Sequence, residues 1–278
     1  MSKTRALIIF ALSAIFLLCS VRIAMIFRDY HDGEEIYEVS REAFVVQETS
    51  PAQVTDPEHE QEPDDPEYDP SEDGPAEELP WYLTSDKSFP ELEVDFETLL
   101  SVNEDIVGWL WIPDTDISYP LLLGADNAEY IHTTYDGSYN SAGSIFMDYR
   151  CSATLEDVNT VIFGHNMKNG TMFGSLKNFE DGDYLRKHRD MYIITPECVR
   201  KYRIYASYVT ENGSGSYTFE FPDAVSIAEY RAYIDEHNCV ETDFTPHEEA
   251  PLVMLSTCTS GRRVERFVVH AALIAIQY

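Results

Sequence analysis

Basic residues are scarce in this chain. Its 278 residues include 19 lysines and arginines against 50 aspartates and glutamates, and the formal net charge is −31. Such a surface would repel the phosphates of a nucleic acid. The composition therefore excludes nucleic acid as an expected partner.

Closely spaced cysteines and histidines are lacking as well. The five cysteines form no C-x-x-C pair, and none of the eight histidines has metal-ligand spacing to another histidine. These absences exclude an expected zinc site, and no other feature predicts a metal or a cofactor. The odd number of cysteines leaves at least one unpaired, and the sequence does not decide whether Cys151, Cys198 and Cys239 form disulfides.

A long apolar run stands near the start of the chain. Residues 6–27 are almost wholly apolar, and as a helix they would span about 33 Å, enough to cross a bilayer core of about 30 Å. Lys3 and Arg5 precede the run and acidic residues follow it, so the positive-inside rule places the N-terminus in the cytoplasm and the rest outside the cell. We expect residues 1–28 to form a cytoplasmic tip and an uncleaved single-pass anchor, because no A-x-A cleavage signal follows the run.

Acidic residues and prolines dominate the next segment, which predicts an extracellular linker over residues 29–88. Between Asp29 and Pro80 there are 19 acidic residues against the single Arg41, interleaved with seven prolines. A segment of this composition cannot bury enough apolar surface to fold alone. It predicts an extended, self-repelling stalk.

Residues 89–278 carry the pattern of a folded, mainly β domain. Residues 89–103 and 226–238 have the spacing of helices, and short apolar runs separated by turn residues predict strands. The predicted strands cover residues 108–113, 117–122, 143–147, 159–163, 191–195, 200–209, 217–221, 252–258 and 266–276. Many short strands with few helices favour a β-barrel or a sandwich.

A cysteine and an arginine near the C-terminus form the clearest candidate site. Cys258 ends one predicted strand and Arg266 begins the next, so a hairpin would place them side by side. A thiolate is a nucleophile, and an arginine, which stays charged, can hold the oxyanion formed when a carbonyl is attacked. His165 follows a β-like run and a glycine, at a strand end where a proton carrier stays open to substrate.

These residues lie within a set of motifs that resembles the class B sortases, the membrane-anchored cysteine transpeptidases of Gram-positive bacteria. The resemblance covers nearly all of residues 89–278. The motifs are Asn103-Glu104-Asp105-Ile106-Val107-Gly108-Trp109, Tyr119-Pro120, Asp126-Asn127-Ala128-Glu129-Tyr130-Ile131, Gly143-Ser144-Ile145-Phe146-Met147-Asp148-Tyr149-Arg150, Gly164-His165-Asn166-Met167, Met172-Phe173-Gly174-Ser175-Leu176, Leu255-Ser256-Thr257-Cys258 and Arg266-Phe267-Val268-Val269. Each motif is weak alone, but the ordered set behind one N-terminal anchor is specific.

The resemblance implies an eight-stranded sortase β-barrel with an N-terminal helical part and a helix before the catalytic strand. It implies that Cys258 is the nucleophile, His165 the general acid and base, and Arg266 the residue that holds the oxyanion or positions the substrate. Three further residues occupy positions that border the sorting-signal groove in class B enzymes: Ser256, Asn127 and Ile131. Phe163 departs from the family pattern, which often has a tyrosine there.

The implied reaction is transpeptidation without a cofactor. A surface protein with a C-terminal sorting signal of the Asn-Pro-x-Thr type would be cleaved after Thr, held as a thioester, and passed to an amine of a peptidoglycan precursor. Water in place of the amine gives slow hydrolysis, as in a cysteine protease.

Three alternatives stay open. The first is a pilus-assembling or pilus-anchoring sortase that uses a pilin lysine or a cell-wall amine as acceptor. The second is a cell-wall cysteine peptidase, and the third is an inactive, membrane-tethered binding module. The sequence ends at Tyr278 directly after the last predicted strand, without the C-terminal membrane segment common in pilin-polymerising enzymes. We therefore expect a cell-wall-anchoring enzyme.

Overall fold

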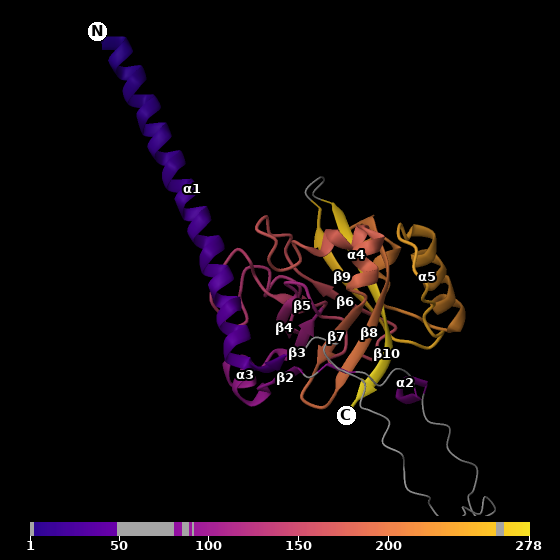
Figure 1. Cartoon of the computed structure of the whole chain (residues 1–278). Helices are drawn as coiled ribbons and strands as arrows, with labels where there is room; N and C mark the ends of the chain where they lie inside the picture. The colour runs from indigo at the N-terminus through magenta and orange to yellow at the C-terminus, as the bar shows by residue number, and fades with distance from the viewer. Residues whose placement is uncertain (1–2, 49–80, 85–88, 91, 260–263) are drawn as a thin grey trace, which may run out of the picture.

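Eight strands close into a barrel in the order β10-β8-β7-β3-β4-β5-β6-β9 (Figure 1). The strands are β3 Ile106–Trp111, β4 Ser118–Leu122, β5 Ile145–Met147, β6 Asn159–Phe163, β7 Asp190–Ile194, β8 Val199–Glu211, β9 Leu252–Cys258 and β10 Glu265–Gln277. Neighbouring strands are antiparallel except for β4 with β5 and β6 with β9. This architecture confirms the predicted mainly β fold with an eight-stranded barrel.

Further elements lie before the barrel strands and between them. They are α1 Lys3–Phe44, β1 Val45–Glu48, α2 Trp81–Thr84, β2 Leu92–Val94, α3 Phe96–Val102, the 3-10 turns η2 Leu176–Glu180 and η3 Gly215–Tyr217, α4 Gly182–Lys187 and α5 Ala224–His237. The helix predicted before the catalytic strand is confirmed as α5, which begins at a capping box formed by Asp223 and Ser226. The helix predicted over residues 89–103 is shorter than expected, because β2 occupies its first part and Asp95 caps α3 through the backbone N–H of Thr98.

The computed structural model describes residues 3–48, 81–84, 89–90, 92–259 and 264–278. Most of the predicted linker, residues 49–80 and 85–88, therefore lies outside the described residues. All five cysteines lie within them, and all five are free.

The first part of the predicted linker belongs instead to the folded structure. The helix α1 does not stop at the end of the apolar run but continues to Phe44, and β1 then pairs with β2. Gly33, Tyr37, Ser40 and Phe44 are buried against the barrel side. Their spacing of four, three and four residues is that of one helix face, which packs although the segment around it is acidic. The expected linker start at residue 29 is thus wrong for residues 29–48.

The strand predicted over residues 217–221 is also absent from the fold. The 3-10 turn η3 ends at Tyr217, and residues 218–221 have no regular structure. The side-chain amide of Asn159 donates hydrogen bonds to the carbonyls of Ser216 and Thr218, at 3.3 and 3.1 Å. Because a side chain satisfies these carbonyls, the segment needs no strand partner.

The strands that carry the candidate site are buried in a dense core and emerge from it only at their ends. Six of the seven residues of β9 are buried, and only its last residue, Cys258, is exposed. β6 pairs with β9 and is buried over its first four residues. The backbone at the site is therefore held by core packing, while the thiol itself reaches solvent.

Replacing Phe44 tests whether the end of α1 is part of the core. Phe44 is 5% exposed and its ring packs edge-on against Tyr135. We expect Phe44→Ala to lower the free energy of unfolding by about 3–5 kcal/mol, the usual cost of deleting a buried phenylalanine. Chemical denaturation of the full chain in detergent, followed by tryptophan fluorescence, measures this. Val39→Ala, on the exposed face of the same helix, is the matched control, and an equal loss in both variants contradicts the packing.

A buried histidine makes the barrel sensitive to acid. His270 of β10 is fully buried among tyrosine rings, and burial lowers its pKa from 6.5 to about 3. Below pH 6.5 His270 binds a proton in the unfolded chain but not in the folded chain, so the stability of the fold decreases as the pH falls from 6.5 toward 3.

Between pH 7 and pH 5 this single group costs about 2 kcal/mol of unfolding free energy. We expect His270→Phe to reduce the drop over this range by about that amount, whereas His237→Gln at an exposed site leaves it unchanged. Denaturation curves at pH 7 and pH 5 measure this drop in the free energy of unfolding. If His270→Phe shows the same drop as the wild type, the acid sensitivity does not come from His270.

Candidate active site

The parallel pairing of β6 with β9 brings the predicted histidine and cysteine together. Phe163 of β6 is in register with Ser256 of β9. Parallel strands end at the same edge of a sheet, so two residues further along each chain His165 and Cys258 reach the same edge, where both line one pocket. Asn166 links the segment after β6 to the end of β9, because its side-chain amide donates a 2.7 Å hydrogen bond to the carbonyl of Cys258.

The antiparallel pairing of β9 with β10 adds the arginine. Arg266 lies directly opposite Cys258 in the ladder, as the predicted hairpin requires. Directly opposite residues of an antiparallel pair place their side chains on the same face of the sheet. A permanent cation therefore stands beside the thiol.

A pocket of about 290 Å³ gathers all six residues singled out from the sequence. Cys258, His165, Arg266, Ser256, Asn127 and Ile131 all line it. The lining is completed by residues that the sequence did not single out as site residues: Phe146, Phe163, Gly164 and Asn212. The aromatic walls and the few convergent polar groups are typical of a site that excludes water around a peptide.

The imidazole of His165 is fixed by a loop of the chain 34 residues earlier. Its Nε2 lies 2.7 Å from the carbonyl oxygen of Ile131. A carbonyl only accepts, so Nε2 carries the proton and Nδ1 is the free nitrogen of the neutral ring. Burial lowers the pKa of His165, the nearby His132 acts in the same direction, and the Ile131 carbonyl opposes both. The resting imidazole is therefore mostly neutral at pH 7.

The remaining wall residues are held by the protein itself. The Ser256 hydroxyl lies 2.7 Å from the hydroxyl of Tyr217. The amide of Asn127 donates to Asp148 at 2.8 Å and accepts from the backbone N–H of Tyr149 at 3.0 Å. Each amide end keeps one further hydrogen-bonding position for a peptide.

Three contributors were missed by reasoning from the sequence. Asn166 stands next to the histidine in its motif, but its bond to the Cys258 carbonyl depends on the β6–β9 register. Tyr217 had been assigned to a strand, whereas its ring stacks on Phe163 at 6.3 Å between centroids. Position 164 favours glycine because the Ile145 side chain packs closely against its backbone, and a Cβ there would lie 2.5 Å from that side chain. None of these three contacts has a signal in the local sequence.

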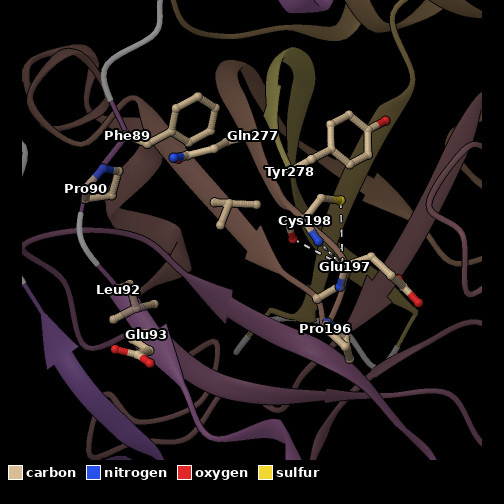
Figure 2. A pocket seen from close by; sticks show the side chains of 11 residues that line it. Phe89, Pro90, Leu92, Glu93, Pro196, Glu197, Cys198, Gln277 and Tyr278 are labelled. Carbon is tan, nitrogen blue, oxygen red and sulfur yellow. Dashed lines mark hydrogen bonds between the residues drawn. The ribbon is translucent and has the colours of Figure 1, made fainter.

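A larger hollow of about 810 Å³ lies beside Gln277 and Tyr278 at the end of β10 (Figure 2). It is lined by residues around β2, the β7–β8 turn and the chain end, including Glu93, Glu197, Cys198 and Tyr278. Along β10, Arg266 and Gln277 are about 36 Å apart at the usual rise per residue. Among the described residues that line this hollow there is no histidine beside the buried Cys198. The chemistry therefore belongs to the smaller pocket.

The fold and the pocket define a closed eight-stranded barrel with cysteine, histidine and arginine at one end. A family profile described as a sortase domain matches residues 110–274. Sortase B of Listeria monocytogenes is 33% identical over 186 residues, which cover 66% of this chain and 76% of that protein. The chain belongs to the sortase family, and within it to class B.

Solved structures agree with this assignment. The sortase B structure from B. anthracis superposes with a TM-score of 0.67 at 27% identity, covering 90% of this chain and 99% of that one. A Staphylococcus aureus sortase B–substrate complex superposes with a TM-score of 0.62 at 25% identity, covering 65% of this chain and 84% of that one. As a class B sortase the protein is a transpeptidase.

The Asn166 bond provides a test of how the site is held together. We expect Asn166→Ala to lower kcat/KM for a sorting-signal peptide about tenfold, the equivalent of one lost hydrogen bond of about 1.4 kcal/mol. The reason is that the end of β9 loses its tie to the histidine loop. Lys168→Ala, an exposed change two residues further along the same loop, serves as control. Equal kcat/KM values in wild type and Asn166→Ala would show that strand pairing alone holds the end of β9 beside the histidine segment.

Proposed function

We propose that the protein cleaves a C-terminal sorting signal after Thr and joins the surface protein to an amine of the cell wall. The Cys258 thiol gives its proton to Nδ1 of His165, and the resulting thiolate attacks the Thr carbonyl while the guanidinium of Arg266 stabilises the oxyanion. The carbon–nitrogen bond then breaks, His165 gives a proton to the departing amine, and a thioester on Cys258 remains.

The second half of the reaction reverses these roles. An amine of a peptidoglycan precursor attacks the thioester and loses a proton to His165. The Cys258 thiolate leaves, and a new amide bond joins the surface protein to the precursor. Water in place of the amine gives a free carboxylate, which is the hydrolytic side reaction.

The pairing of Cys258 with Arg266 in register, beside His165 at the end of β6, is the observation that carries this proposal. A binding module without chemistry has no need for a cation opposite an exposed thiol. Ser256, Asn127 and Ile131 line the same pocket, and in the proposal they contact the sorting signal. Sortase B of S. aureus has been solved as a substrate complex, and this supports the proposal that the present chain binds a substrate as well. An Asn-Pro-x-Thr-like motif is the proposed signal.

The apolar part of α1 supports a place at the cell membrane. By length and composition α1 is long and apolar enough to cross a bilayer, with a mean hydropathy of 2.5 in its most apolar window and none of that window buried. We propose a single-pass protein with a cytoplasmic N-terminus and the barrel outside, as Lys3 and Arg5 favour. The tether between membrane and barrel is then the helix itself.

Mass spectrometry of the full chain in detergent tests the reaction directly. The protein is incubated with a panel of sorting-signal peptides, with and without an amine acceptor. We expect a thioester adduct on Cys258, cleavage after Thr and an amine-linked product. The full chain is needed, because a fragment starting at residue 89 lacks the packed part of α1.

Two variants make this result decisive. Cys258→Ala removes the nucleophile, so we expect neither adduct nor product. Cys239→Ala changes another exposed cysteine outside the pocket, and we expect it to keep the wild-type activity. Turnover that survives in Cys258→Ala would rule out the proposed mechanism.

A further inference from the structure

The helix α1 joins the membrane segment to the barrel without a break. It is one helix from Lys3 to Phe44, with exposed apolar side chains up to Phe27 and the charged Arg28 directly after them. At about 1.5 Å per residue, Asp29 lies only ~3 Å along the axis beyond Phe27. Any part of the barrel that touches Asp29 is therefore close to the level at which the apolar run ends.

One surface loop, residues 132–141, makes that contact. The side-chain amide of Asn140 donates a 3.0 Å hydrogen bond to the carbonyl of Asp29, and the Ser141 hydroxyl donates to the Asp29 carboxylate. One turn later Gly33 permits close approach, because a Cβ there would lie 2.6 Å from the Asn140 amide oxygen. These contacts hold the 132–141 loop beside the first helical turn after the apolar run.

The outward side of the 132–141 loop suits a lipid headgroup region. Tyr139 is 81% exposed, and it precedes the residue that bonds to Asp29. Tyrosine has an apolar ring and a polar tip, and it is enriched where membrane meets water. Its neighbours in the loop are mostly small and polar, which a hydrated headgroup layer accommodates.

The same loop is in contact with the catalytic histidine. Ile131, directly before the loop, accepts the hydrogen bond from His165 Nε2. His132 stacks on His165 with 5.5 Å between ring centroids and 10° between planes. Figure 1 shows the N-terminal half of α1 extending past the end of the barrel that is opposite to the C-terminus. That is the end where β9 stops at Cys258 and β10 begins.

We propose that the 132–141 loop rests with Tyr139 in the headgroup layer of the membrane that α1 spans, so that the catalytic pocket opens at the membrane surface. This rests on the membrane anchoring of α1 proposed above. An amine or peptide presented by the membrane then meets Cys258 without any movement of the barrel away from its anchor.

Depth-dependent fluorescence quenching in vesicles tests this contact. The full chain is reconstituted in phosphatidylcholine vesicles in which part of the lipid carries bromine at a shallow or a deep acyl position. Three variants each add one tryptophan, namely Tyr139→Trp, Tyr278→Trp and Phe16→Trp. The emission of the added tryptophan is obtained by subtracting the spectrum of the wild type. Tyr278 is 79% exposed at the opposite end of the barrel, so it receives the same change away from the membrane.

We expect the added emission of Tyr139→Trp to shift to the blue and to be quenched more by shallow than by deep bromine. Phe16→Trp should be quenched most by deep bromine, and Tyr278→Trp by neither. If Phe16→Trp is quenched while Tyr139→Trp behaves like Tyr278→Trp, the loop contact is overturned and the anchor stands. If Phe16→Trp is not quenched, the membrane anchoring fails and the loop contact fails with it.

Discussion

The parallel pairing of β6 with β9 is the constraint on which the catalytic arrangement depends. These two strands are separated by almost ninety residues of chain, and both are buried in the barrel. A slip of one residue in their register would turn every side chain of one strand to the other face. Burial therefore fixes the register, and the register fixes His165 against Cys258. The free energy that holds the core together also holds the proposed reacting groups in place.

The helix α1 extends this rigidity beyond the barrel. Tyr37 donates a hydrogen bond to the carbonyl of Gly143, deep in the segment that leads into β5. The stripe of Gly33, Tyr37, Ser40 and Phe44 is buried along the same side of the helix. An anchor that ended in a flexible stalk would leave the barrel free to tumble. In the proposed membrane-anchored arrangement, a helix that is packed over its last three turns instead fixes the position of the barrel relative to the membrane.

The sequence predicted the barrel strands well because each of them has its own local signal. Residues 252–258 and 159–163 are strands with the predicted bounds, since alternating or continuous apolar runs between turn residues need no knowledge of the partner. The prediction that Cys258, His165 and Arg266 form a catalytic trio came from motif order and from one short hairpin, and the structure places all three in one pocket. The linker prediction failed for residues 29–48 because it rested on the average composition of the segment. The many acidic residues around Tyr37 and Phe44 outweighed the few buried residues of the helix face that packs on the barrel. Tyr217 was misassigned because the group that satisfies its neighbours, Asn159, lies almost sixty residues away.

The roles of charge in the proposed reaction divide between Arg266 and His165. The role proposed for Arg266, stabilising the oxyanion, needs no transfer of a proton. His165 differs, because burial lowers its pKa and its Nε2 proton is committed to the Ile131 carbonyl. The nitrogen that accepts and returns protons in the reaction is then Nδ1. The fraction of molecules with a charged imidazole is small at pH 7 and rises as the pH falls. Burial therefore has the largest effect on the pKa of His165, while the Ile131 carbonyl fixes the direction of the imidazole and opposes the lowering.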